Sequence, residues 1–210
     1  MRTMHRHSPR ATGNRQPATS SGYTLIEILT VIVIMGTIFV IVVPAFAEMR
    51  RRMALRAASS ELRAIFHLAR MRAITRGRNC GLKFATTSGQ WRFAIYDDGD
   101  GDGVRNDDIA KGIDKLVHPP RVILRESRIV TIGLLSEKIK DPDGDPLPPT
   151  KSPVHFNSSA ICSFSPLGES TPGTIYITDR NRGLWCVRVY GASAKVRTLR
   201  WDPDAKRWLS

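Results

Sequence analysis

The sequence predicts an α+β protein in which one long N-terminal helix packs on an antiparallel β-sheet head. Residues 28–47 form an apolar run of twenty residues without a formal charge. Residues 48–77 lack proline and repeat apolar side chains at steps of three and four, which indicates that the helix continues in amphipathic form. Residues 80–201 contain short β-like runs separated by turn residues, which is typical of an antiparallel sheet.

The apolar run has the length and composition of a membrane span. A helix of twenty residues rises about 30 Å, which matches the hydrocarbon thickness of a bilayer. Thr30 and Thr37 are its only polar side chains, and Gly36 and Pro44 lie inside it. Pro44 removes one backbone donor, so we expect a local loosening there. Glu27 stands just before the run, where burial of a carboxylate is costly.

The second half of the helix is predicted to bury one face on the head. The helix should extend from about Thr24 to Arg76, since Gly77 is a plausible stop. Nine arginines lie among residues 48–78, where they could meet lipid head groups, acidic neighbours or only water. The apolar positions that recur on one face are Leu55, Ala58, Leu62, Ile65, Phe66, Ala69 and Ala73.

The head, residues 79–210, is predicted to be rich in β-strands. The runs with strand character cover residues 80–84, 91–96, 122–124, 129–134, 154–156, 161–165, 174–178, 184–190 and 195–201. Alternation in residues 184–190 places Trp185, Val187 and Val189 on one face, which we expect to be the inner one. The proline-rich polar segment 140–153 is expected to be a loop.

Charge and cysteine content argue against some classes of protein. The net charge of +13 is concentrated in residues 48–78, which carry +7, so the whole chain does not read as a nucleic-acid binder. Cys80, Cys162 and Cys186 fit no metal-binding template. They are either small buried hydrophobes or include one disulfide, for which Cys162 and Cys186 are the candidates.

The N-terminal motif Gly22-Tyr23-Thr24-Leu25-Ile26-Glu27 resembles the processing site of type IV prepilins and type II secretion pseudopilins. The resemblance implies that residues 1–22 are a basic leader, cut off between Gly22 and Tyr23 by a prepilin peptidase, and that Tyr23 is then N-methylated. Most members carry Phe where this chain has Tyr23. The resemblance also implies that residues 23–47 first cross the inner membrane and later form the filament core, while the leader is cytoplasmic and the head periplasmic.

The resemblance gives Glu27 a role in assembly. In pilin-like filaments the implied partner of this carboxylate is the new N-terminal amine of its own or a neighbouring subunit. Pairing would neutralise both charges and set the register between subunits. A glutamate that reaches water at the membrane interface is the alternative.

The head resembles one subgroup, the GspH/FimT-like pseudopilins, through 97-DDGDGDGVRNDD-108, 164-FSPLGES-170 and 173-GTIYIT-178. In the first of these segments Asp98, Asp100, Asp102 and Gly103 have the spacing that opens a Ca²⁺-binding loop. The twelfth position is Ile109 rather than a bidentate glutamate. The alternatives are therefore a Ca²⁺ site and a solvated acidic turn.

Two functions follow from these features, and neither is enzymatic, because no catalytic arrangement of residues stands out. The first is a structural pseudopilin or minor pilin that joins other subunits in an envelope filament of a type II secretion or type IV pilus machinery. The second is a minor pilin that captures DNA, for which Lys195, Arg197 and Arg200 beside Trp201 are the candidate residues. An ordinary single-pass anchored protein is a third possibility.

Overall fold

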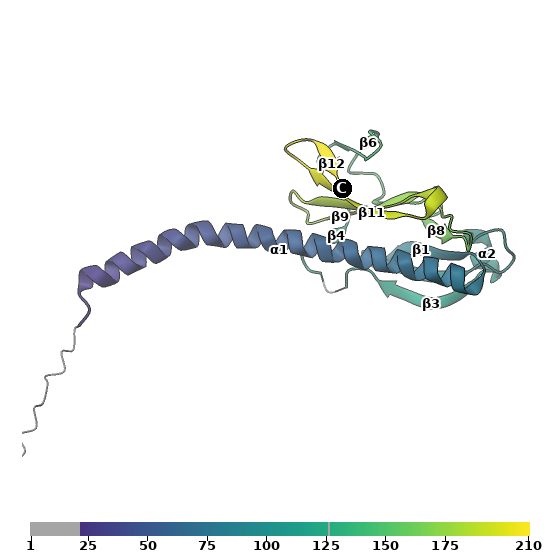
Figure 1. Ribbon diagram of the computed structural model, residues 1–210, viewed down its shortest axis with the longest axis horizontal. Helices are drawn as coiled ribbons and strands as arrows, with labels where there is room; N and C mark the ends of the chain where they lie inside the picture. Colours follow the sequence, from purple (N-terminus) through teal and green to yellow (C-terminus); the bar gives the residue numbers. More distant parts are fainter. Residues whose placement is uncertain (1–21, 126) are drawn as a thin grey trace, which may run out of the picture. The chain divides into compact units, whose positions relative to one another are not determined.

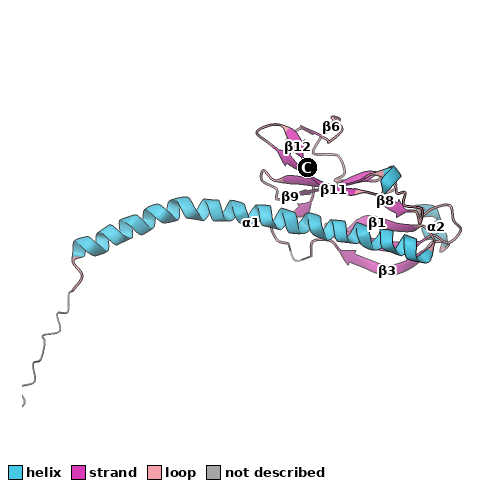
Figure 2. Cartoon of the chain, in the orientation of Figure 1, coloured by secondary structure: helices cyan, strands magenta, loops and turns pink. Residues whose placement is uncertain are grey.

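The computed structural model describes residues 22–125 and 127–210 and confirms the α+β class, with one long helix and antiparallel sheets (Figures 1 and 2). The predicted leader, residues 1–22, lies outside the described residues except for Gly22. Helix α1 spans Leu25–Arg76, one residue shorter than the sequence predicts. The chain divides after Pro44 into two compact units, the second of which is Ala45–Ser210.

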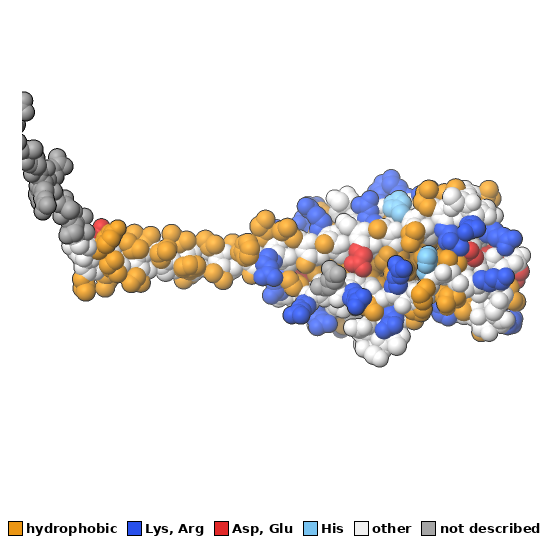
Figure 3. All heavy atoms as spheres, turned by 90° about the horizontal axis from the view of Figure 1, so that it is seen from below, with side chains coloured by type: hydrophobic (Ala, Val, Ile, Leu, Met, Phe, Trp, Pro, Cys, Tyr) orange, Lys and Arg blue, Asp and Glu red, His pale blue; other side chains and the backbone are white. Residues whose placement is uncertain are grey.

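The N-terminal unit contains the apolar part of α1. Every residue from Gly22 to Arg50 is exposed, and Figure 3 shows the helix covered with apolar side chains. In the described part of the chain, α1 is the one helix that is long and apolar enough to cross a membrane. Its two hydroxyls stay within the helix, because Thr30 Oγ1 donates to Ile26 O at 2.7 Å and Thr37 Oγ1 to Val33 O at 2.6 Å. No polar side-chain group of this run therefore requires water.

The head-packing part of α1 buries the face that the sequence predicts. All seven residues of the predicted stripe are buried, and Ser59 is the one further buried residue of the helix. Two polar contacts fix this part of the helix to the head. The guanidinium of Arg72 binds both carboxylate oxygens of Asp97, at 2.7 and 2.6 Å. The carboxylate of Glu61 accepts the backbone N–H of Leu124 at 3.0 Å.

The first sheet has the strand order β3-β2-β1-β8 and is antiparallel throughout, with β1 at Cys80–Thr87, β2 at Gln90–Asp97, β3 at Lys115–Val122 and β8 at Ile161–Phe164. The predicted strand at residues 122–124 is wrong, because the strand ends at Val122 and begins seven residues earlier. Pro119 and Pro120 hid it from sequence analysis. Proline donates no hydrogen bond, and an edge strand such as β3 tolerates it. The short helix α2, Asn106–Lys111, precedes this strand.

The second sheet has the order β12-β11-β10-β9-β4, and β7 also pairs with β9. Its strands are β4 at Thr131–Ile132, β7 at Val154–His155, β9 at Gly173–Thr178, β10 at Leu184–Val189, β11 at Val196–Asp202 and β12 at Arg207–Leu209. The predicted strand at 129–134 is thus reduced to two residues. A 3-10 turn, Gly191–Ser193, joins β10 to β11.

The main core lies between α1 and both sheets. Its centre is Phe66, which is fully buried. The ring of Phe66 lies 6.0 Å from that of Phe84, 5.9 Å from that of Phe156 and 6.3 Å from that of Phe164, measured between centroids. One helical side chain therefore holds strands of the first sheet and the end of β7 together.

A second core covers the opposite face of β10 and corrects two predictions. Val187 and Val189 face the main core as expected, but Leu184 and Cys186 on the other face are equally buried. Their cover comes from β5, Ile139–Lys140, and β6, Pro146–Leu147, which pair within the segment expected to be a plain loop. The residues of this second core are Leu135, Ile139, Leu147, Tyr176, Leu184, Cys186 and Trp201.

The three cysteines are all free and buried. Cys162 lies in the main core and Cys186 in the second core, so the two candidate partners of a disulfide are in different cores of the head. Burial raises the pKa of the Cys80 and Cys186 thiols to about 12 each, and raises that of Cys162 as well. They act as small buried apolar side chains.

Candidate functional site

The predicted processing site lies at the start of α1. Gly22, Tyr23 and Thr24 precede the helix and are exposed, so the peptide bond between Gly22 and Tyr23 is outside regular structure. The N–H of Glu27 donates to Thr24 Oγ1 at 3.3 Å, which caps the first turn of the helix. Thr24 and Glu27 have the spacing of a capping box, a signal that sequence analysis missed. Glu27 therefore also stabilises the helix start, where a negative charge suits the helix dipole.

The acidic loop between β2 and α2 is organised by two buried carboxylates. Asp98 is 3% exposed and accepts four hydrogen bonds, from Asn79 Nδ2 at 2.7 Å and from the backbone N–H groups of Asp100, Gly101 and Gly103 at 3.1, 2.7 and 2.8 Å. Asp114, which sequence analysis did not single out, accepts the N–H groups of Gly99 and Arg105 at 3.2 and 2.9 Å. No short-range pattern reveals Asp114, because it reaches the loop from beyond α2.

The hydrogen bonds to Asp98 determine its charge state. Burial by itself would raise the pKa of this carboxyl, but the bonds from Asn79 and from the three backbone groups outweigh burial and hold the pKa below its usual value. Asp98, Asp100 and Asp102 can place one oxygen each within 4.8 Å of one another. Asp102 is also paired with Arg105 at 2.6 Å. The Ca²⁺ site stays a prediction. The hydrogen bonds to Asp98 hold the loop in the same conformation without an ion.

The predicted DNA-binding residues lie on two faces of β11. Cross-strand partners share a face of a sheet, and β11 pairs Arg197 with Arg188 and Arg200 with Trp185. Arg200 therefore faces the α1 side of the sheet, and Arg197 faces the opposite side. Lys195, Arg197 and Arg200 are all exposed. Lys195 and Arg197 are neighbours in the sequence. Arg200 lies on the other face of the sheet from Arg197, so the three residues do not form one surface.

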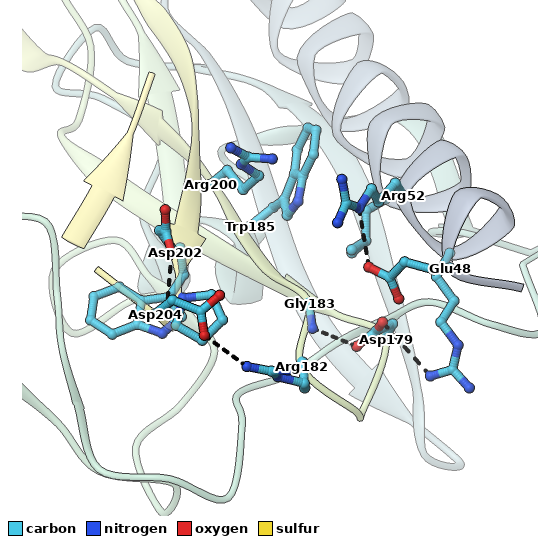
Figure 4. Close-up of a pocket in the computed structure, with 13 residues that line it drawn as sticks. Glu48, Arg52, Asp179, Arg182, Gly183, Trp185, Arg200, Asp202 and Asp204 are labelled. Carbon is cyan, nitrogen blue, oxygen red and sulfur yellow. Dashed lines mark hydrogen bonds and ion pairs between the residues drawn. The ribbon is translucent and has the colours of Figure 1, made fainter. Parts of the chain in front are cut away.

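A cavity of about 520 Å³ opens between α1 and the second sheet, and Figure 4 shows its lining. Arg200 and Trp185 lie side by side there and face Arg52 of the helix. The charges of the cavity largely cancel, because Arg52 pairs with Glu48 at 3.1 Å and Arg182 with Asp204 at 3.0 Å. The carboxylate of Asp179 accepts the N–H groups of Asn181 and Gly183, and that of Asp202 accepts those of Asp204 and Ala205. Asp179 and Asp202 therefore stabilise turns, and Glu48 and Asp204 form ion pairs.

Comparison with known protein families identifies a family that covers most of the head. The family model of the type II transport protein GspH matches residues 58–193, which is more than half of the chain. Searches of curated proteins and of solved structures find no match. The matched segment begins inside the head-packing part of α1 and ends at the turn before β11, so it is independent of the processing motif at Gly22. The family consists of structural pseudopilins rather than enzymes. The chain therefore belongs to the GspH family of type II transport proteins.

Proposed function

We propose that this pseudopilin is made as a precursor, cut by prepilin peptidase between Gly22 and Tyr23, methylated on Tyr23, and assembled with other pilin-like subunits in an envelope filament. The observation that carries the proposal is the position of the motif. Helix α1 begins at Leu25, two residues after the cleavage site, and the apolar residues that follow are all exposed. Such a surface needs lipid before assembly and protein afterwards.

The proposed location follows from the same helix. An apolar span and membership of a pseudopilin family fit a protein anchored in the inner membrane. We propose that the leader faces the cytoplasm, where the peptidase acts, and that Ala45–Ser210 lies in the periplasm. Membership of the family fits a type II secretion filament as well as a type IV pilus.

Glu27 would act in assembly through its charge. Leaving an ionised carboxylate unpaired among apolar side chains costs at least about 2.5 kcal/mol, so it requires a partner. Cleavage after Gly22 creates a positive amine on Tyr23, four residues before Glu27. A salt link between this amine and Glu27 of the same or a neighbouring subunit would remove both charges from the filament core.

The cleavage step is tested with Gly22→Ala in the full chain. We expect this variant to keep its leader, so that its mass in membrane extracts exceeds that of the mature protein by residues 1–22. Gly36→Ala is the matched control, because Gly36 lies outside the motif, inside α1, and, as at Gly22, no atom lies within 4 Å of an added Cβ. Normal processing of Gly22→Ala, or equal loss of processing in both variants, would contradict the proposal.

The assembly step is tested with Glu27→Gln. Glutamine keeps the shape of Glu27 and leaves the bond from its backbone N–H to Thr24 Oγ1 possible, but carries no charge. We expect the variant to be processed normally and to be strongly depleted in isolated filaments. Incorporation at the wild-type level would show that the charge of Glu27 has no part in assembly.

DNA capture by the head is the alternative function, and the exposure of Lys195 and Arg197 supports it. Binding through phosphate contacts should weaken steeply as salt increases. The test is a gel shift of the full chain in non-ionic detergent, with Lys195, Arg197 and Arg200 replaced by alanine. Replacement of the exposed Lys115 and Arg121 on β3 is the control. No shift of DNA by the wild type at low salt would exclude this function.

A further inference from the structure

The part of α1 that packs on the head carries a second uncharged stripe, on the side away from the core. Its four large members are 58% (Met49), 60% (Met53), 51% (Leu68) and 57% (Met71) exposed. Positions of a helix advance by about 100° per residue, which places this stripe on the face roughly opposite the buried one. Its members, all exposed, are Met49, Met53, Ala57, Ser60, Ala64, Leu68, Met71 and Thr75.

The spacing of the stripe shows that it runs straight along the helix. The steps are four, four and three residues, and this set repeats, so that Met49, Ser60 and Met71 are eleven residues apart. Eleven residues in three turns give about 3.67 residues per turn, close to the helical 3.6. The stripe therefore stays on one face for about 39 Å, because residues 49 and 75 are 26 steps apart and each step rises about 1.5 Å. A regular face of this length suits another helix lying alongside.

One edge of the stripe is lined by arginines at positions 52, 56, 63 and 70. Arg52 pairs with Glu48, and Arg70 donates to the carbonyl of Ala194 at 3.4 Å. Arg56 and Arg63 are exposed, and among the described residues no carboxylate lies within ion-pair distance of either. Basic side chains are spread over the face of the head seen in Figure 3, and acidic ones are few. The edge therefore offers two uncommitted positive charges.

Grooves flank both ends of the stripe, and its middle is formed by small residues. A cavity of about 490 Å³ lies between Met49, Met53 and Trp185 of β10. Another of about 410 Å³ lies beside Leu68 and Met71, next to Ile95 of β2. Between them the stripe consists of Ala57, Ser60 and Ala64, which would allow a second helix to approach closely while larger side chains fill the grooves.

We propose that this stripe binds an amphipathic helix of a different subunit, whose acidic side chains pair with Arg56 and Arg63. The inference rests on the proposed function as a filament subunit and specifies the partner. A second copy of this chain does not fit, because the segment 48–78 carries nine arginines and only two glutamates. Both glutamates are engaged, Glu48 with Arg52 and Glu61 with the backbone of Leu124. A lipid surface fits poorly, because the small central residues offer little apolar area to insert.

The test is site-directed crosslinking in membranes from cells that express the full chain with its filament partners. Ser60→Cys is labelled with a benzophenone maleimide and irradiated. The native thiols are buried and protonated, so the new cysteine is the reactive one. Thr150→Cys is the control, because Thr150 is exposed and follows Leu147 of the second core by three residues, away from α1 in the chain.

The proposal predicts a crosslink from position 60 to a peptide of another protein, and none from position 150. The captured peptide should have apolar residues at helical spacing and at least two Asp or Glu residues on one flank of its apolar face. Arg56→Glu with Arg63→Glu should reduce this product at least about tenfold, and the corresponding lysine changes should retain most of it. Tryptophan fluorescence checks that both double variants are folded.

Several outcomes would overturn the proposal. These are a product of twice the subunit mass, a product with phospholipid, a captured peptide without acidic residues, and a yield that the charge reversal leaves unchanged. Absence of any product from position 60 counts equally against it. The masses from the same experiment report whether residues 1–22 have been removed, so a failure of processing is recognised separately from a failure of the stripe to bind.

Discussion

Replacement of Asp98 by asparagine should destabilise the head by about 3 kcal/mol. Asparagine has the same size but offers one oxygen where aspartate offers two. That oxygen can still accept the N–H groups of Asp100 and Gly101, and Asn79 can rotate to accept from the new amide. The N–H of Gly103 then faces an amide donor in a buried site. An unsatisfied buried donor costs about 1–3 kcal/mol, and loss of the charged acceptor adds to this cost.

The pH dependence of this effect has a defined sign. The pKa of Asp98 is lower in the folded protein than its usual value of 3.8. Its ionised form therefore contributes stability that is fully present above about pH 4 and is lost as the pH falls through the folded-state pKa. The difference between wild type and Asp98→Asn should be constant near neutral pH and shrink below pH 4.

The assay is urea unfolding of the full chain in detergent, followed by tryptophan fluorescence. All four tryptophans, at positions 91, 185, 201 and 208, lie in the head, so the apolar part of α1 gives no signal. Measurements in EDTA test the loop without metal, and repetition with Ca²⁺ tests the cation. Asp100→Asn is the control, because Asp100 is exposed and should change stability by less than about 0.5 kcal/mol.

Two results would refute this reasoning. One is a loss below about 0.5 kcal/mol for Asp98→Asn in EDTA, which would mean that the hydrogen bonds do not hold the loop. The other is a difference that develops only when Ca²⁺ is added, which would make Asp98 a metal ligand first. A wild-type stability that does not respond to Ca²⁺ would remove the predicted Ca²⁺ site.

Three further predictions concern the packing of the head, and the same urea assay tests them. Phe66→Ala should lower the free energy of unfolding by about 4–5 kcal/mol, because it empties a fully buried site in contact with three rings. Phe66→Leu should cost clearly less, and equal losses for the two variants would mean that the structure closes around the emptied site. Gly173→Ala should cost about 2 kcal/mol or more, since its Cβ would overlap the carbonyl oxygen of His155 on β7, and wild-type stability would deny that close pairing. Leu147→Ala should cost about 2–4 kcal/mol, whereas Leu167→Ala should cost almost nothing, because Leu167 is 90% exposed. The reverse order would mean that the segment around β6 does not cover a core.

The sequence was sufficient where the determining pattern is local. A period of 3.6 residues in residues 55–73 identified the buried face of α1 except for Ser59, because every residue of a helix has its hydrogen-bond partner four positions away. The apolar run and its boundary near Tyr23 are equally local. The processing site could be proposed from six adjacent residues, since a peptidase reads a continuous stretch of chain.

The sequence was insufficient where strands pair at long range. Strand β3 was missed, because its two prolines argue against a strand unless its position at the sheet edge is known. The alternation in β10 indicated one inner face, whereas both faces are buried. The second cover comes from residues 135–147, some forty positions earlier in the chain.

The sequence by itself determined that an apolar helix follows the predicted processing motif, and that the helix continues on a β-rich head. Only the tertiary structure decided how the charged residues are grouped. It placed Arg200 and Arg197 on opposite faces of β11 and joined Asp114 to the loop of Asp98. Among the described residues, it also left Arg56 and Arg63 without an ion-pair partner beside the exposed uncharged stripe. The physical reason is that strand register and helix packing, and not distance along the chain, determine which side chains share a surface.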